Sequence, residues 1–375
     1  MTKRILVLAG EVSGDLHAAG LIKELQRLRP DLEFLGIGGE QMKACGVKLF
    51  YHINQLSFLG FWEVVKHLNF IRQVKKRLLA EMDSDPCHLA VLVDYPGFNL
   101  RLAEDLKKRS IPIIYYISPQ IWAWGGKRIE KIKKLVEKMI VFFPFEEELY
   151  QKHSVNVEFV GHPLAELAKP RLGKREFLER LGLEQECQLI GLFPGSRLQE
   201  VRQHLPIMLR AVEIIQATKN EFHFLIGLAP GIEIGFAESM LPANLPVKIV
   251  DGYNYDIMAY SELLLVKSGT TTVEASLSGT PFVVMYKVSP LSYLIAKRMV
   301  KIPNLAMANI LAGRQIVPEL IQNEATPERI AREMSGILED QARYARIKKE
   351  LGAIRHKLGT GNVYLKAAQN VAEFI

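Results

Sequence analysis

The residues of this chain that can do acid–base chemistry lie in short polar segments directly after apolar runs. The segment 9–15, Ala-Gly-Glu-Val-Ser-Gly-Asp, and the nearby His17 supply two acids and an imidazole beside two glycines, which permit a close approach of the backbone to a ligand. Asp94 follows the apolar run Leu89–Val93 and opens the segment Asp94-Tyr-Pro-Gly-Phe-Asn99. A carboxylate at that position is a candidate general base, and it is equally placed to cap the helix that follows.

Two later segments indicate a site for a phosphorylated ligand. Gly195, Ser196 and Arg197 form a glycine turn with a hydroxyl and a guanidinium before a helix, which is typical of a phosphate cradle. The segment 268–274, Ser-Gly-Thr-Thr-Thr-Val-Glu, fills the first turn of another helix with hydroxyls. The sequence therefore predicts that the following groups bind a diphosphate at that helix start: Ser268, Gly269, Thr270 and Thr271.

Glu274 completes this second segment, six residues after Ser268, where its carboxylate can accept both hydroxyls of a ribose. The alternative is a threonine-rich helix start with a solvated glutamate. Neither segment has the spacing GxxxxGK[ST] or GxGxxG, so ATP chemistry and a dinucleotide site are disfavoured. The pattern favours a nucleotide-sugar.

Aromatic and basic residues stand together after a third apolar run. The segment 118–124, Ser-Pro-Gln-Ile-Trp-Ala-Trp, holds two of the three tryptophans of the chain, and Lys127 and Arg128 follow it. One interpretation is a packed aromatic corner. The other makes Trp122 part of a wall that contacts a sugar or acyl chain, with Lys127 and Arg128 as an anion-binding rim.

The segment 56–79 is apolar at first, with Phe61 and Trp62, and amphipathic afterwards. Between Lys66 and Arg77 it carries five Lys or Arg residues and no acid. It is either a helix that packs on the core with a solvated basic side or a patch that lies among lipid headgroups.

These segments must be positioned by a regular scaffold, and the apolar runs predict one. The runs are short and continuous, as in parallel strands buried on both faces, and helical patterns alternate with them. Alternation of this kind predicts parallel sheets, at whose carboxyl edges ligands bind. The runs are Ile5–Leu8, Leu89–Val93, Pro112–Ile117, Met139–Phe142, Val157–Val160, Leu189–Phe193, Phe222–Ile226, Val247–Val250, Leu263–Val266 and Phe282–Met285.

Length and composition set the class of protein. A chain of 375 residues with 49% hydrophobic and 24% charged residues is long enough for two doubly wound α/β domains and excludes a disordered chain. The net charge of +7 favours an anionic partner. The three cysteines are well separated, which indicates a reducing compartment. The apolar run at the start has only five residues, and no run approaches the ~18–20 apolar residues that span a membrane. These features predict a cytoplasmic protein that does not cross a membrane.

Seven segments together resemble the GT-B glycosyltransferases and, more narrowly, the bacterial lipid-A-disaccharide synthase family. The match runs from end to end of the chain, in order and at matching separations. The segments are Ala9–Asp15, Asp94–Asn99, Ser118–Trp124, Phe159–Pro163, Pro194–Arg197, Ser268–Glu274 and Asn309–Arg314.

The resemblance implies two Rossmann-like domains that face each other across a cleft. Residues 1–165 are expected to bind the acceptor and lipid, residues 166–345 the UDP-sugar donor, and a C-terminal helix in 346–375 returns to the first domain. That helix packs within its own chain or is exchanged in a homodimer. The implied reaction joins UDP-2,3-diacylglucosamine to 2,3-diacylglucosamine 1-phosphate, with inversion, into a β(1→6) disaccharide and UDP. The implied location is the cytoplasmic face of the inner membrane.

The resemblance also distributes roles among residues. Asp94 is the general base, with His17 and Asp15 as alternatives on the neighbouring segment, and Glu11 and Ser13 belong to the acceptor side. Arg197 and the helix start at 268–272 hold the diphosphate in place of a metal ion, and Glu274 holds the ribose. Asn309 and Gln315 are expected to contact the donor. No cofactor is expected, and Asp83-Ser84-Asp85, which matches a metal-binding DxD pattern, precedes a strand and so lies at the wrong edge of the sheet.

Other functions are compatible with part of the sequence. The chain resembles other GT-B enzymes that act on UDP-sugars, such as a 2-epimerase or a transferase with a soluble acceptor, but neither needs the apolar segment 56–79. A non-catalytic nucleotide-sugar-binding module keeps Arg197 and Glu274 and has no use for Asp94. A nucleic-acid reader requires basic residues interleaved with exposed aromatics on one platform, which the sequence does not offer.

Overall fold

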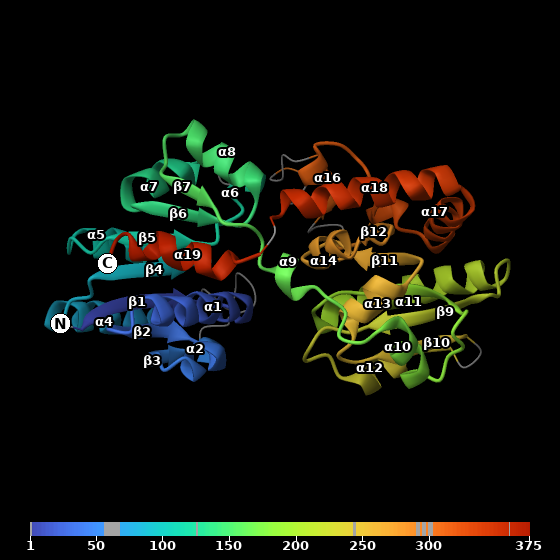
Figure 1. Cartoon of the computed structure of the whole chain (residues 1–375), viewed down its shortest axis with the longest axis horizontal. Helices are drawn as coiled ribbons and strands as arrows, with labels where there is room; N and C mark the ends of the chain where they lie inside the picture. The colour runs from blue at the N-terminus through green and yellow to red at the C-terminus, as the bar shows by residue number, and fades with distance from the viewer. Residues whose placement is uncertain are drawn as a thin grey trace. The chain divides into compact units, whose positions relative to one another are not determined.

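The computed structural model describes residues 2–55, 68–124, 127–242, 245–289, 293–294, 298, 303–359 and 361–375. The chain divides into two compact units (Figure 1). Unit 1 comprises Met1–Pro163 together with Gly359–Ile375, and unit 2 comprises Leu164–Leu358.

Unit 1 is built on a parallel sheet whose strand order, over the described residues, is β3-β2-β1-β4-β5-β6-β7. Its strands are β1 (Lys3–Ala9), β2 (Leu32–Gly38), β3 (Lys48–His52), β4 (Leu89–Val93), β5 (Ile113–Tyr116), β6 (Lys138–Val141) and β7 (Val157–Phe159). Its helices are α1 (Val12–Leu28), α2 (Glu40–Ala44), α4 (Leu68–Ser84), α5 (Pro96–Lys107), α6 (Ile121–Trp124), α7 (Lys127–Leu135), α8 (Pro144–Lys152) and α19 (Val363–Ala372), with a 3₁₀ turn at Ile53–Gln55.

Unit 2 repeats the architecture with the strand order β10-β9-β8-β11-β12-β13. Its strands are β8 (Gln188–Phe193), β9 (Phe222–Gly227), β10 (Val247–Val250), β11 (Leu263–Lys267), β12 (Phe282–Tyr286) and β13 (Glu319–Ile321). Its helices are α9 (Leu164–Leu167), α10 (Lys174–Arg180), α11 (Leu198–Gln216), α12 (Ile234–Glu238), α13 (Asn254–Tyr260), α14 (Thr271–Ser278), α16 (Met307–Ala312), α17 (Pro327–Glu339) and α18 (Gln341–Lys357), with a 3₁₀ turn at Gln322–Glu324.

The predicted doubly wound fold is confirmed in both units. Every strand pairing in the two sheets is parallel, and each apolar run of the sequence overlaps a strand. The central strands are buried on both faces, and β4 is buried along its whole length. Continuous apolar runs arise in this setting because helices cover both faces of the sheet.

Three strands of the structure were not predicted from the sequence. β2 contains Gly36 and Gly38, and glycine weakens the pattern of a strand. β3 is an edge strand without a fully buried residue, and β13 has only three residues. Their signals are therefore weaker than those of the central strands.

The C-terminal segment divides at a different residue from the one predicted. Helix α18 is continuous over Gln341–Lys357 and packs against α14 and α16, so these residues belong to unit 2. The return to unit 1 begins at Gly359 rather than at residue 346. Helix α19 then packs along α1, as the adjacent ribbons show in Figure 1. Exchange of this helix between two copies stays a prediction.

Among the helices that the structure describes, none is both long enough and apolar enough to cross a membrane. Within the same residues, no group of three or more His, Cys, Asp or Glu side chains is arranged to hold a metal ion.

Candidate functional site

The polar segments that the sequence singled out lie at the carboxyl edges of the two sheets. In unit 1, β1 pairs with β4, and Ala9 stands beside Val93. The segments that begin at Gly10 and Asp94 therefore leave the sheet next to each other. In unit 2, β8 pairs with β11, and Phe193 stands beside Val266. The segments that begin at Pro194 and Ser268 are neighbours for the same reason.

Asp94 lies in an uncommon backbone conformation. Its φ is 44° and that of Tyr95 is 45°, so two consecutive non-glycine residues occupy the left-handed region. Two buried side chains hold this turn, because Asn99 Nδ2 and the Tyr115 hydroxyl both donate to the Asp94 carbonyl, at 2.8 and 2.6 Å. Strain of this kind persists where the surroundings hold it, and such places are often functional sites.

The carboxyl group of Asp94 is adapted to accept a proton near neutral pH. Burial, reinforced by the negative charge of Glu11, raises the pKa of Asp94 to about 6. Glu11 itself is exposed at the N-cap of α1. The structure thus brings Glu11 and Asp94 together, as predicted, and adds Tyr95, which the sequence analysis did not select.

Tyr95 explains one of the glycines in the first segment. A Cβ placed on Gly10 would lie 2.2 Å from the Tyr95 ring. Only glycine permits this approach. The two segments are therefore fitted to each other, and Gly10 is needed for packing between them.

The Asp15 carboxylate is not available as a catalytic base. Its carboxylate is 3% exposed and accepts three backbone N–H groups, from Gly39 at 2.6 Å, Gln41 at 3.0 Å and Met42 at 3.1 Å. These amides are the unpaired donors at the start of α2. The structure corrects the expectation that Asp15 is an alternative base, because its oxygens are occupied in capping a helix.

This correction gives a measurable prediction. Asp15→Ala removes the acceptor of three amides, so we expect the free energy of unfolding to fall by about 2–4 kcal/mol. Urea denaturation monitored by circular dichroism measures the change. Turnover per folded molecule should stay within about threefold of the unsubstituted chain, since general base catalysis supplies ~10²–10⁴-fold. A loss of that larger size in folded protein would restore Asp15 as a base.

His17 is tied to the C-terminal helix. Its Nδ1 lies 3.0 Å from the Tyr364 hydroxyl, and its ring meets Phe142 edge-on at 5.3 Å between centroids. Burial lowers the pKa of His17 to about 4. The ring is therefore neutral at physiological pH and a weaker base than Asp94. Tyr364 was missed in the sequence because it lies 347 residues away.

The aromatic segment forms a packed corner. Trp122 meets Phe145 edge-on at 5.2 Å between centroids, and its indole nitrogen is buried. The neighbouring Glu146 is 3% exposed, and burial raises its pKa to about 8. This favours the structural interpretation of Trp122 over a contact wall for substrate.

The remaining residues predicted for the acceptor side divide into two sets. Ser13 and Arg128 are exposed. Phe61 and Trp62, with residues 56–67 of the segment 56–79, lie outside the described residues, as does the side chain of Lys127. Their predicted contact with lipid or phosphate stays a prediction.

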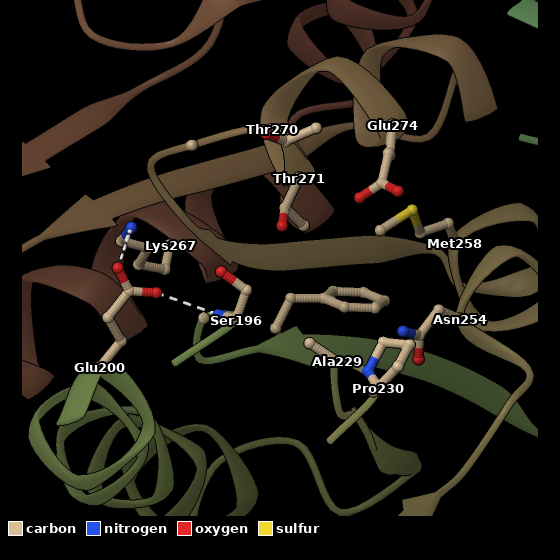
Figure 2. A pocket seen from close by; sticks show the side chains of 14 residues that line it. Ser196, Glu200, Ala229, Pro230, Asn254, Met258, Lys267, Thr270, Thr271 and Glu274 are labelled. Atoms are coloured by element: carbon tan, nitrogen blue, oxygen red, sulfur yellow. Dashed lines mark hydrogen bonds and ion pairs between the residues drawn. The ribbon is translucent and has the colours of Figure 1, made fainter. Parts of the chain in front are cut away.

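Unit 2 contains a cavity of about 230 Å³, called here the unit 2 cavity (Figure 2). Both predicted phosphate segments contribute to it, and so do the ends of β8, β9 and β11. Its lining consists of Phe193, Gly195, Ser196, Glu200, Gly227, Ala229, Pro230, Asn254, Met258, Lys267, Gly269, Thr270, Thr271 and Glu274.

Glu274 projects into the unit 2 cavity, as Figure 2 shows. Its Oε1 accepts a hydrogen bond from the Tyr255 hydroxyl at 3.0 Å, and burial raises its pKa despite that bond. The carboxylate is thus held by one partner on α13. The interpretation of Glu274 as a solvated glutamate is wrong, because the side chain is largely buried.

The first phosphate segment is shaped by Glu200. Gly195 has a φ of 131°, and a Cβ there would lie 2.6 Å from Glu200 Oε2. The same oxygen accepts the Ser196 N–H at 3.0 Å. Arg197 is the N-cap of α11 and is exposed, and it does not belong to the described lining.

Lys267 and Glu200 form an ion pair that the sequence analysis did not assign. Lys267 Nζ lies 2.8 Å from Glu200 Oε1, and both side chains are largely buried. Burial alone would raise the pKa of Glu200, but the hydrogen bond and charge of Lys267 outweigh it and the pKa is lowered. The sequence feature that could have identified Lys267 is its position at a strand end, directly before Ser268.

Asn309 and Gln315 do not belong to the described lining of the unit 2 cavity. Asn309 has no exposed surface, and its amide is saturated by bonds to the backbone of 316–317 and to Glu319. Gln315 is exposed and lines a separate polar hollow with Arg314 and Arg343. The structure corrects the expectation for Asn309, whose amide braces the loop before β13. Gln315 lies outside the unit 2 cavity, and its contact with the donor stays a prediction.

Ser268 also lies beside the cavity rather than in it. Its hydroxyl is directed to the Leu305 carbonyl at 3.5 Å, whereas Gly269, Thr270 and Thr271 belong to the lining. Thr272, behind them, donates to the Gly269 carbonyl at 2.7 Å and accepts the Met307 N–H at 3.2 Å. The Thr272 hydroxyl therefore stabilises the start of α14.

A family model described as lipid-A-disaccharide synthetase matches residues 5–374. The chain belongs to this family. The lipid-A-disaccharide synthase of Geobacter sulfurreducens is 39% identical over 373 residues, which cover 99% of this chain and 97% of that protein. The chain is therefore a glycosyltransferase of lipid A disaccharide synthesis, as the sequence motifs predicted.

Solved structures support the fold independently of sequence. A UDP-GlcNAc 2-epimerase from Neisseria meningitidis bound to UDP-GlcNAc has a TM-score of 0.63 at 12% identity, over 99% of this chain and 98% of that chain. The glycotransferase of kitacinnamycin has a TM-score of 0.64 at 16% identity, over 99% of each chain. At these identities the likeness establishes the GT-B fold and does not favour the epimerase alternative.

Proposed function

We propose that the chain transfers the sugar of UDP-2,3-diacylglucosamine to the 6-hydroxyl of 2,3-diacylglucosamine 1-phosphate, with inversion at the anomeric carbon. The products are a β(1→6) disaccharide 1-phosphate and UDP. The observation that carries the proposal is the unit 2 cavity, in which the largely buried Glu274 carboxylate and the two predicted phosphate segments converge within a chain of this family.

The lining of the unit 2 cavity supports binding of a uridine nucleotide. Phe193, Pro230 and Met258 give one part of it an apolar surface suited to a base. The Glu274 carboxylate suits the two ribose hydroxyls. Thr270 and Thr271, at the N-terminus of α14, suit the diphosphate because backbone N–H groups and the helix dipole favour negative charge there.

Asp94 is the proposed base on the acceptor side. It takes the proton of the acceptor 6-hydroxyl while that oxygen forms the new bond to the anomeric carbon. The bond from that carbon to the diphosphate oxygen breaks at the same time, and the electron pair stays on the oxygen. Inversion by one displacement requires no covalent nucleophile, only a base and stabilisation of the departing charge.

The direct test is release of UDP. We expect purified protein to release UDP only when UDP-diacylglucosamine and diacylglucosamine 1-phosphate are both present, with one disaccharide formed per UDP. Mass spectrometry of the lipid product and a coupled UDP assay measure the two products. UDP release without the acceptor, or none with both substrates, would contradict the proposed function.

We also propose that the enzyme works at the cytoplasmic face of the inner membrane, because both proposed substrates carry acyl chains. Helix α4, with its exposed basic residues Arg72, Lys76 and Arg77, supports attraction to anionic headgroups. Sedimentation with vesicles of anionic phospholipid should bring down the protein at low salt and release most of it at 0.5 M NaCl, a condition in which the Debye length is about 4 Å. Equal sedimentation with zwitterionic vesicles would contradict an electrostatic contribution.

A further inference from the structure

Lys267 provides positive charge inside the unit 2 cavity. Among the described residues of the lining it is the one cation, beside the two acids Glu200 and Glu274. Arg197 is exposed and does not belong to that lining. An anionic ligand in this cavity therefore meets two carboxylates, and the charge that can offset them is that of Lys267.

The lysine is held in one orientation. Glu200 accepts from Lys267 Nζ through one oxygen and from the Ser196 N–H through the other, at 2.8 and 3.0 Å. The ammonium also lies 5.4 Å from the centre of the Tyr286 ring, within the range of a cation–π contact. Its side chain is only 14% exposed. Glu200 thus ties the end of β11 to the first phosphate segment.

An ammonium group has three N–H donors, and the bond to Glu200 uses one of them. A Cβ placed on Gly269 would lie 3.6 Å from Lys267 Nζ, so the charge also lies beside the second phosphate segment. Figure 2 shows its Nζ near Glu200 and Ser196, on the phosphate side of the cavity and away from Asn254 and Pro230. The cation is therefore placed for the phosphates rather than for the base.

We propose that Lys267 binds the diphosphate of the UDP-sugar and stabilises the negative charge that develops on it as the bond to the anomeric carbon breaks. Glu200 is its positioning residue. This inference rests on the proposed function, because it assigns a ligand group to the same cavity.

The test compares ligands that differ only in phosphate. Uridine, UMP and UDP are titrated by calorimetry into the unsubstituted chain and into Lys267→Met. We expect the dissociation constant for uridine to change by less than twofold and that for UDP to rise on the order of 10- to 100-fold. UDP affinity equal to that of the unsubstituted chain would overturn the proposal, and so would a loss for uridine as large as that for UDP. Lys267→Gln, of similar length, gives a second variant if the first does not fold.

A second comparison separates direct contact from mere neutralisation of Glu200. In Lys267→Met the Glu200 carboxylate loses its partner and would itself repel a diphosphate. In the double variant Lys267→Met/Glu200→Gln that repulsion is absent. A direct contact predicts that the double variant still binds UDP at least about tenfold more weakly than the unsubstituted chain. Recovery of full affinity would overturn the proposal.

Lys219 offers a matched control. It also forms an ion pair in unit 2, with Glu339 at 3.1 Å, and it does not line the cavity. Lys219→Met should leave UDP affinity unchanged. An unsubstituted chain that binds none of the three ligands contradicts the proposed function itself. If Lys267→Met binds UDP and turns over as the unsubstituted chain does, only the role of Lys267 is contradicted.

Discussion

Asp94→Asn is expected to lower kcat by about 10²- to 10⁴-fold, the usual contribution of a general base. Asparagine keeps the size of the side chain and cannot accept a proton at neutral pH. The strained turn is held through the Asp94 carbonyl by Asn99 and Tyr115, and these bonds do not involve the carboxylate. The substitution should therefore leave the backbone in place, and steady-state kinetics with both substrates measures its effect.

The control for this prediction is binding of UDP. Asp94 belongs to unit 1 and the unit 2 cavity to unit 2, so the dissociation constant for UDP should stay within about twofold. Normal turnover in the Asp94→Asn variant would show that another group accepts the proton. A large loss of UDP affinity would show instead that the variant has lost its structure.

The pH profile provides a second measurement of the same carboxylate. Because the pKa of Asp94 is raised to about 6, the base is protonated and inactive below that pH and ionised above it. The acid limb of kcat/KM should therefore have its midpoint near pH 6. Glu11→Gln should move it to lower pH, because the charge of Glu11 contributes to the raised pKa. An unmoved limb would contradict this assignment.

Glu274→Ala is expected to raise the dissociation constant for UDP by roughly 100-fold. One buried carboxylate that accepts two hydroxyl groups makes two charge-assisted hydrogen bonds, each worth about 1.5–3 kcal/mol, partly offset by loss of the bond from Tyr255 in the free chain. KM for the donor should rise with it, whereas kcat at saturating donor should change less. Calorimetry and initial rates measure the two effects.

The ligand itself supplies the sharpest control for Glu274. UDP that lacks both ribose hydroxyls should bind weakly to the unsubstituted chain. Its dissociation constant should be the same for Glu274→Ala, because the hydroxyls that the carboxylate would accept are absent. Glu233→Ala, which changes an exposed glutamate outside the lining, should leave both affinities unchanged. If Glu274→Ala lost as much affinity for the dideoxy ligand as for UDP, the carboxylate would not bind the ribose.

The sequence by itself determined which segments could form a site. Short continuous apolar runs that alternate with helical patterns require parallel sheets, and polar segments after such runs must lie at the carboxyl edge. This argument is local, because it depends only on residues within about ten positions of each other. It located the segments at Gly10, Asp94, Pro194 and Ser268. The family came from the resemblance of seven motifs spread over the whole chain.

Tertiary structure decided which polar groups stay available. Asp15 is occupied by amides 24 to 27 residues away, His17 by a hydroxyl 347 residues away and Glu200 by a lysine 67 residues away. Strand order and the return of α19 bring these partners together, and no local pattern encodes either. A polar side chain in a segment can be read from sequence, but its hydrogen-bond partner is fixed only when distant elements pack, because burial makes every unpaired polar group costly.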